Sequence, residues 1–192
     1  IALAFYDWPG YAGGPNIMAR RLLPELKRRG HAVRGHVLSR GDASPAADWL
    51  ETEGVNVCRG SLLWGTRRKV RWFLKALQEF DADIFIPFIS AAAAYAGRWV
   101  REAGRPTIVS HVSDDAFNWG MADEFAIRNH AWKASGLHCI SQALADQVKA
   151  QCHAATVATI PNWGEATKHV ATQSGPIRVV YSGRLNQPQK RI

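Results

Sequence analysis

The chain has 192 residues, of which 47% are hydrophobic and 21% charged, and its formal net charge is +8. This is an ordinary globular composition, and no apolar run approaches the roughly 20 residues of a membrane-spanning helix, so the sequence argues against an integral membrane protein. The positive charge favours an anionic partner without saying which kind, and simple solubility is the alternative. The three cysteines lack metal-ligand spacing and indicate reduced thiols, as in a cytoplasmic protein.

The start of the chain predicts a strand, a loop and a helix. Ile1–Phe5 is a short apolar run typical of a buried parallel strand, and Tyr6–Pro15 is rich in turn residues. Beyond it, apolar residues recur with helical spacing. We predict Asn16 as the N-cap of this helix and Gly30 as its left-handed C-terminal cap.

Gly13 and Gly14 stand where the predicted loop meets the predicted helix. Glycines let the backbone approach an anion closely, and the free N–H groups at a helix N-terminus attract one. Their spacing matches neither the dinucleotide-binding pattern G-x-G-x-x-G nor the phosphate-loop pattern G-K-[ST]. Both residues are therefore candidates for phosphate or substrate contact, with an ordinary strand-to-helix turn as the alternative.

Further along, predicted strands and helices alternate. The strands are His31–Leu38, Val55–Cys58, Asp83–Phe88, Thr107–Val112, Leu137–Ile140 and Val157–Ile160. The helices are Ala46–Glu53, Gly65–Phe80, Ala91–Ala103, Met121–Ala134 and Ala143–Cys152. This order predicts an α/β fold, a doubly wound parallel sheet of Rossmann-like type covered by helices on both faces.

The end of the chain predicts a domain boundary. We expect one domain over residues 1–162, a polar linker over 163–176, and the first strand and loop of a second domain over 177–192. A lone strand after a linker cannot bury a core of its own. The chain is therefore expected to hold one full domain and the opening of another.

Four short motifs, in this order and spacing, resemble the GT-B fold glycosyltransferases of family 4. They are Gly13-Gly14 ahead of a helix ending Arg29-Gly30-His31-Ala32-Val33, then Cys139-Ile140-Ser141, then Thr159-Ile160-Pro161-Asn162, and finally Val180-Tyr181-Ser182-Gly183-Arg184-Leu185 with Lys190. The resemblance implies the first half of a two-domain enzyme. Such enzymes move a sugar from a nucleotide-sugar to an acceptor in the cleft between domains, generally with retention and without a metal or other cofactor.

Several roles follow from this resemblance. Arg184 and Lys190 would hold the donor pyrophosphate, and a guanidinium fork with an ammonium suits a diphosphate leaving group, although a solvated basic turn is the alternative. Pro161 and Asn162 would mark the hinge. The family's following Gly-Val-Asp is replaced here by residues 163–165, Trp-Gly-Glu, so the hinge turn is expected to differ. The donor, the acceptor and the linkage are not written in this chain, and half a cleft is expected to be inactive alone.

His111 ends a predicted strand, and in open α/β sheets ligands bind beyond the carboxyl ends of strands. Members of the resembled family often keep a histidine here, near the transferred sugar, which implies a catalytic role in positioning or polarising the reacting groups. A hydrogen-bonded structural histidine is the alternative. Asp114 and Asp115 follow, and would either act on an acceptor hydroxyl or cap the next turn.

The segment Leu63–Phe80 combines cations with tryptophans. At 100° per residue, Val70 and Leu77 lie on an apolar face and Trp72 lies off it, and an extra helical turn would bring Trp64 beside Trp72. The cations on that side are Arg67, Arg68, Arg71 and Lys75. This pattern suits an interfacial helix on an anionic membrane at its cytoplasmic face, or a lipid-linked acceptor. The alternative is a surface helix whose Trp72 is covered by another segment.

Two other functions compete with a glycosyltransferase. One is a non-catalytic Rossmann-like domain that binds a nucleotide or phospho-ligand, for which no dinucleotide fingerprint is present. The other is nucleic-acid binding through the basic face, which predicts strong salt dependence. The chain lacks helix-turn-helix and RNA-binding signatures, so no nucleic-acid partner is expected.

Overall fold

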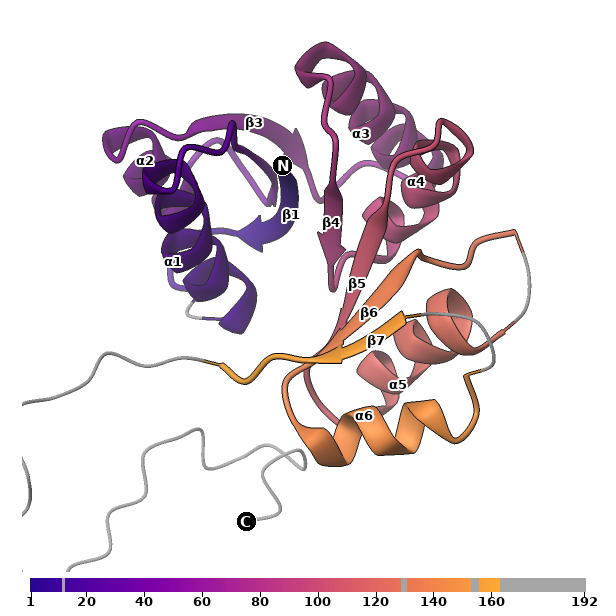
Figure 1. Ribbon diagram of the computed structural model, residues 1–192. Coiled ribbons are helices and arrows are strands. Elements are labelled where there is room, and N and C mark those ends of the chain that lie inside the picture. The colour runs from indigo at the N-terminus through magenta and orange to yellow at the C-terminus, as the bar shows by residue number, and fades with distance from the viewer. Residues whose placement is uncertain (12, 129–130, 153–155, 163–192) are drawn as a thin grey trace, which may run out of the picture. The chain divides into compact units, whose positions relative to one another are not determined.

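The computed structural model describes residues 1–11, 13–128, 131–152 and 156–162 (Figure 1). Ile1–Pro161 form one compact unit. The predicted linker at 163–176, the predicted start of a second domain at 177–192, and with it Arg184 and Lys190, lie outside the described residues.

The described strands form one parallel sheet in the order β3-β2-β1-β4-β5-β6-β7. They are β1 (Ala2–Asp7), β2 (Arg34–Ser39), β3 (Asn56–Ser61), β4 (Phe85–Phe88), β5 (Thr107–His111), β6 (Gly136–Cys139) and β7 (Thr156–Thr159). Each predicted strand is present with its ends shifted by no more than three residues. The doubly wound, Rossmann-like α/β architecture is therefore confirmed.

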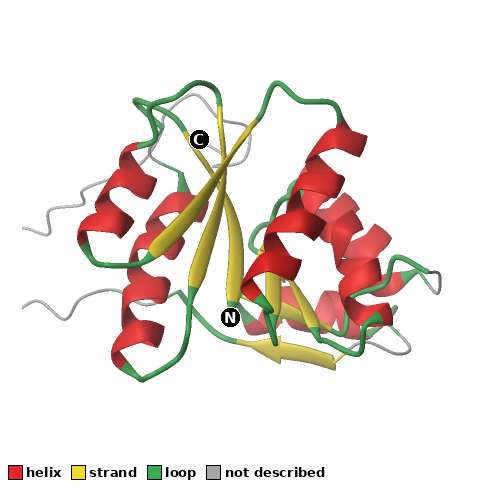
Figure 2. Ribbon diagram, turned by 90° about the horizontal axis from the view of Figure 1, so that it is seen from above, coloured by secondary structure: helices red, strands yellow, loops and turns green. Residues whose placement is uncertain are grey.

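Helices cover both faces of the sheet, as Figures 1 and 2 show. They are α1 (Gly14–Arg28), α2 (Pro45–Thr52), α3 (Thr66–Phe80), α4 (Ala91–Glu102), α5 (Ala116–Ala122), the π-helix η1 (Asp123–Ile127) and α6 (Gln142–Lys149). α1 and α2 lie on one face, and α3 to α6 lie on the other. None of the helices in the described ranges is long and apolar enough to cross a membrane.

β1 supplies the core on both faces because successive side chains of a strand point to opposite sides. Leu3 and Phe5 pack with α1 and α2, whereas Ala2 and Ala4 pack with α3 and α4. A third cluster joins β5 and β6 to α5 and α6 around Phe125. The central strand is thus buried from both sides, as a parallel sheet requires.

The strand order reverses beside β1. The chain runs outward from β1 to β3 and then returns to the other side of β1 to form β4. The Tyr6 hydroxyl donates to the carbonyl of Ile89 (3.3 Å), so the end of β1 is tied to the loop after β4. Ligands of doubly wound sheets bind at the carboxyl edge near such a reversal.

The predicted start of the first helix was wrong. α1 begins at Gly14 with Gly13 as its N-cap residue, not at Asn16. Asn16 is buried in the first turn, where its amide donates to Asp7 rather than capping the helix. The predicted end is confirmed: Gly30 has a φ of +87°, and its N–H donates to the carbonyl of Lys27.

The helix predicted over Met121–Ala134 was also wrong. α5 begins five residues earlier, at Ala116, because Asp115 caps it. The helical segment ends with the π-helix at Ile127, and the Ala134 N–H donates to the carbonyl of Phe125 (2.7 Å).

The interpretation of Trp72 as an outward side chain among cations is corrected by its packing. Its ring lies 4.7 Å from that of Phe73 and 6.1 Å from that of Trp64, and a Cβ on Gly60 would come within 3.0 Å of it. Trp72 is thus half-buried against β3 and the preceding loop. Trp64 lies in that loop, because α3 begins at Thr66.

Candidate functional site

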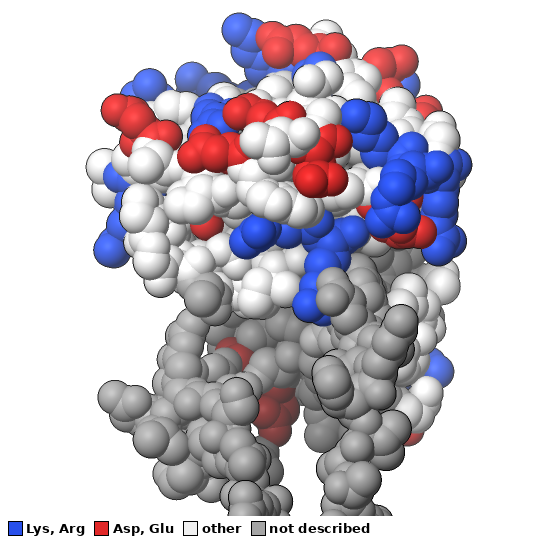
Figure 3. Space-filling model, turned by 90° about the vertical axis from the view of Figure 1, so that its left-hand side faces the viewer, with Lys and Arg blue, Asp and Glu red and all other residues white. Residues whose placement is uncertain are grey.

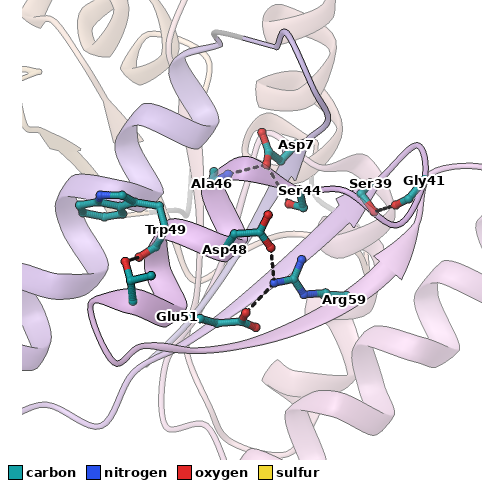
Figure 4. Close-up of polar contacts among 10 residues, drawn as sticks. Asp7, Ser39, Gly41, Ser44, Ala46, Asp48, Trp49, Glu51 and Arg59 are labelled. Carbon is teal, nitrogen blue, oxygen red and sulfur yellow. Dashed lines mark hydrogen bonds and ion pairs between the residues drawn. The ribbon is translucent and has the colours of Figure 1, made fainter.

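Asp7, the last residue of β1, organises the loops at the carboxyl edge of the sheet (Figure 4). Its carboxylate is 1% exposed. Oδ2 accepts hydrogen bonds from the Ser44 hydroxyl (2.8 Å) and from the Ala46 N–H (2.7 Å), at the start of α2. Oδ1 accepts from the Asn16 amide (3.0 Å) in the first turn of α1. One buried carboxylate therefore fixes the starts of two helices through three hydrogen bonds.

The loop after β1 is held by its own aromatic residues. Asn16 Nδ2 also donates to the carbonyl of Tyr11 (2.8 Å), and the Trp8 and Tyr11 rings stack with centroids 4.0 Å apart. The Tyr11 ring lies so close to Gly13 that an added Cβ would come within 2.1 Å of it. Gly14 has open space around it and is exposed at the first turn of α1. The close approach of the Tyr11 ring therefore requires a glycine at position 13.

His111, the last residue of β5, is fully buried. Its ring centroid lies 5.9 Å from that of Trp119, and the ring lies against the backbone of Asn118. No contact of either ring nitrogen with the described residues has hydrogen-bond geometry. Burial lowers the pKa of His111, opposed by the Asn118 backbone and by the charges of Asp115 and Asp114. The imidazole is therefore neutral near pH 7, with one nitrogen as donor and the other as acceptor.

The two aspartates after His111 differ. Asp115 caps α5: Oδ1 accepts from the backbone N–H groups of Phe117 and Asn118, each at 3.0 Å. Oδ2 accepts from the Asn118 side-chain amide (2.8 Å). The structure thus supports the capping alternative for Asp115, whereas Asp114 is exposed. A catalytic role for either carboxylate stays a prediction.

Asn118 is a residue that sequence reasoning missed. It is 6% exposed, and its Oδ1 has no hydrogen-bond partner among the described residues. A buried polar group without a partner costs about 1–3 kcal/mol. The end of β5 and the first turn of α5 therefore hold buried polar atoms that have no hydrogen-bond partner among the described residues. The signal in the sequence was a weak one, an amide three residues after a capping aspartate.

A second set of unpaired buried atoms lies under α3. His36 is fully buried, neither of its ring nitrogens has a hydrogen-bond partner in the part of the chain that the structure describes, and its ring lies edge-on to those of Trp72 and Phe73. Burial, with a smaller contribution from Arg34, lowers its pKa to about 3. His36 is a neutral imidazole in an aromatic core. It lies on β2, which β1 and β4 separate from β5 in the sheet.

The loop after β1 that carries Gly13 and Gly14 is called here the glycine loop. The structure brings it and His111 to the same edge of the sheet, at the ends of β1 and β5 with β4 between them. Pro161 and Asn162 are exposed just after β7. The preceding residue, Ile160, is held by the His138 ring, whose Nε2 lies 2.8 Å from its carbonyl oxygen. The hinge role of Pro161 and Asn162 stays a prediction. Within the described residues no three His, Cys, Asp or Glu side chains form a metal-binding group.

The chain matches a known protein family, and its fold is similar to those of solved structures. A family model described as a glycosyl transferase 4-like domain matches residues 13–163. The fold is similar to that of the lipopolysaccharide outer core galactosyltransferase WaaB in its apo form, with a TM-score of 0.62 and 15% identity over 88% of this chain and 47% of that one. No curated protein sequence matches the chain.

Two further solved structures show how widely this fold is used. Alr3699/HepE from Anabaena, in complex with UDP and glucose, has a TM-score of 0.54 and 18% identity over 84% of this chain and 44% of that one. UDP-GlcNAc 2-epimerase from Neisseria meningitidis, bound to UDP-GlcNAc, has a TM-score of 0.50 and 10% identity over 82% of this chain and 46% of that one. The chain thus spans about half the length of these proteins, and at such identities the likeness shows the fold alone.

Proposed function

Because the chain belongs to the glycosyl transferase 4-like family, we propose that it is the acceptor-side half of an enzyme that transfers a sugar from a nucleotide-sugar to an acceptor. The observation that carries the proposal is the extent of the family match, residues 13–163, which takes in the glycine loop, His111 and the end of β7. The UDP, glucose and UDP-GlcNAc bound by proteins of similar fold support a nucleotide-sugar as the co-substrate.

The roles of individual residues follow from this proposal. The backbone at Gly13 and Gly14 approaches the phosphates or the acceptor from this half of the cleft, and Arg184 and Lys190 hold the donor diphosphate. Neutral His111 positions the sugar or polarises a hydroxyl without bringing a positive charge. We propose that transfer retains anomeric configuration and needs no metal.

The first experiment is a donor screen on the complete protein. UDP-, GDP- and ADP-sugars are scored for nucleotide release with and without candidate sugar and lipid-linked acceptors. Acceptor-dependent release with one donor supports the transferase and identifies its nucleotide. Absence of both release and thermal stabilisation with every nucleotide-sugar points instead to a phospho-ligand binding domain. Product NMR then tests retention, and full activity in EDTA tests metal independence.

We further propose that the N-terminal part of α3 meets an anionic membrane surface on the cytoplasmic side. Arg67, Arg68, Arg71 and Lys75 are exposed, and the Arg68 guanidinium lies over the Trp64 ring (4.6 Å). Leu63, in the loop before the helix, is 78% exposed. An exposed apolar side chain beside cations suits the boundary of an anionic bilayer. Figure 3 shows that on the face carrying α1 and α2, by contrast, basic and acidic residues are interspersed.

Vesicle co-sedimentation tests this surface. Vesicles with anionic lipid should bind the protein at low salt, and neutral vesicles should not. Arg71→Glu should weaken binding, whereas Lys149→Glu, the same change of charge at an exposed position on α6, should have a smaller effect. Equal loss in both variants would mean that net charge, and not this surface, directs binding.

A further inference from the structure

An arginine that has no acidic partner among the described residues lies beside the glycine loop. Ser39 and Asp7 are paired as the last residues of β2 and β1. Arg40 and Trp8 follow them, and the guanidinium carbon of Arg40 lies 5.8 Å from the centroid of the Trp8 ring. We propose that Arg40 binds an oxyanion of the acceptor, a phosphate or a carboxylate, and so selects anionic acceptors. The inference rests on the function proposed above, because it names the class of acceptor.

The loop that carries Arg40, between β2 and α2, is fastened at both ends (Figure 4). At its start, the Ser39 hydroxyl donates to the carbonyl of Gly41 (2.6 Å). At its end, the Ser44 hydroxyl donates to the carboxylate of Asp7 (2.8 Å). The backbone on either side of Arg40 is therefore held before any ligand arrives, which reduces the conformational entropy that binding has to remove.

The aromatic stack under Arg40 connects it to the glycine loop. The Trp8 ring, over which the guanidinium lies, stacks on the Tyr11 ring with centroids 4.0 Å apart. The Tyr11 ring in turn lies so close to Gly13 that an added Cβ would come within 2.1 Å of it. A cation over a ring is attracted by the charge distribution of the ring, and this contact uses none of its N–H donors. Arg40 is therefore a supported cation whose donors remain available beside the glycine loop.

The Arg40 guanidinium has no hydrogen-bond acceptor in the part of the chain that the structure describes. No hydrogen bond or ion pair joins it to another described residue, including Asp42 in the same loop. By contrast, Arg59 on the neighbouring strand β3 is paired with Asp48 (2.8 Å) and with Glu51 (2.6 Å), as Figure 4 shows. Because Arg40 is also exposed, its donors are accessible to a ligand from solvent.

The donor geometry selects the class of ligand. A guanidinium carries a positive charge and five N–H donors in a planar fork, and it has no acceptor. A carboxylate or a phosphate matches this fork with two parallel hydrogen bonds, whereas a neutral sugar hydroxyl accepts without adding charge attraction. The net charge of +8 also favours an anionic partner. A purely structural contact that covers the Trp8 ring is the competing role that an experiment has to exclude.

The test follows the Nε–H signal of Arg40 by NMR in the complete protein with ¹⁵N-labelled arginine. The probes are the 6-phosphates and the uronates of glucose, galactose and mannose, and the controls are the neutral hexoses, inorganic phosphate and UDP. We expect at least one sugar phosphate or uronate to shift the Arg40 signal at concentrations at which every control leaves it in place. A response to the phosphates alone, or to the uronates alone, identifies the oxyanion that the acceptor carries.

Calorimetric titration of the tightest probe measures what the side chain contributes. Arg40→Gln should weaken binding at least tenfold, as for one lost hydrogen bond between charged groups. Arg40→Lys keeps the charge without the fork and should lose less affinity. Arg20→Gln is the matched control, because Arg20 is likewise exposed and lies over a tryptophan, Trp49, at 4.6 Å. This control variant should bind the probe like wild type.

Each of the other outcomes contradicts one part of the argument. An Arg40 signal that responds to none of the anionic sugars would overturn the proposal, as would equal affinity in wild type and Arg40→Gln. A response to UDP alone would assign Arg40 to the donor and not to the acceptor. Binding of an anionic sugar without transfer from any nucleotide-sugar would leave the anion site standing and refute only the transferase. Transfer to a neutral acceptor that Arg40→Gln leaves unchanged would refute only the anion site.

Discussion

The side-chain amide of Asn16 donates a hydrogen bond to the carboxylate of Asp7, and this contact joins the first turn of α1 to the last residue of β1. The second carboxylate oxygen of Asp7 joins the same point to the start of α2. The shape of the carboxyl edge therefore depends on one buried carboxylate whose hydrogen-bond partners come from the starts of two helices. Loops that bind ligands gain accuracy when a rigid scaffold holds them in this way.

Asp7→Ala should lower the free energy of unfolding by about 3 kcal/mol, because it leaves the buried hydroxyl of Ser44 and the N–H of Ala46 without their acceptor. Urea unfolding measures this loss. Asp48→Ala is the matched control: Asp48 pairs with Arg59 at an exposed position, and its loss should cost less than about 1 kcal/mol. Similar losses in the two variants would show that Asp7 does not organise the edge.

Gly13→Ala should displace the Tyr11 ring and break its stacking on Trp8, at a cost of about 1 kcal/mol. Near-ultraviolet circular dichroism reports the stack, and urea unfolding reports the cost. In a Tyr11→Ala background the same glycine substitution should cost little, because the clash is gone. Gly14→Ala, with open space around it, should be neutral or slightly stabilising at the start of α1. Additive effects of Gly13→Ala and Tyr11→Ala would contradict the described contact.

His36→Leu should make the protein less sensitive to acid. The pKa of His36 is about 3 in the folded protein and near 6.5 in the unfolded chain, so between these values the unfolded chain binds a proton that the folded protein does not. Wild type therefore loses stability as pH falls below 6.5, by up to about 1.4 kcal/mol per pH unit, and the variant lacks this loss. Unfolding curves at pH 7.5 and pH 5 measure the difference, which should grow by about 2 kcal/mol in favour of His36→Leu. A difference that does not change with pH would contradict the neutral buried imidazole.

His111→Ala should lower kcat at least tenfold in the complete enzyme while leaving its folding intact. The reason is the loss of the neutral donor and acceptor at the end of β5. Burial lowers the pKa of His111, so activity should not decline through its protonation until the pH is below its ordinary value of 6.5. Initial rates with the donor found by the screen measure both effects. His31→Ala, an exposed histidine beyond α1, should keep wild-type turnover, and unchanged kcat in His111→Ala would refute the role.

Much of the fold could be predicted from the sequence because its signals are local. Short apolar runs bounded by turn residues marked the strands, and Gly30 marked the end of α1 because only a residue tolerant of positive φ suits that position. Asn16 misled for a physical reason: its residue type suits an N-cap, but its amide is used by Asp7, a partner nine residues away. The start of α5 was missed although Asp115 is a good capping residue, because the apolar pattern that was followed begins only at Met121.

The site was harder to predict than the fold. The position of His111 at a strand end could be predicted, but the lack of hydrogen-bond partners for its ring among the described residues could not, since that depends on side chains packed from other elements. Trp72 is a second residue whose surroundings could not be predicted from its own segment. A helical projection places it among cations, but the missing side chain of Gly60 on β3 leaves room for its indole. A projection of one helix contains no information about the neighbouring strand.

The place of β1 in the sheet also has a consequence for how the chain folds. β1 pairs with β2 and with β4, where Ala2 lies opposite Phe85, and every other pairing among the described strands joins consecutive ones. Because Ala2 and Phe85 lie far apart in the chain, the pairing of β1 with β4 forms slowly compared with the pairing of consecutive strands. During synthesis from the N-terminus, the buried strand β1 therefore keeps one open edge until β4 has been made. An open edge on an apolar strand invites pairing with other chains, so nascent chains that end before residue 85 should be the species most prone to aggregation.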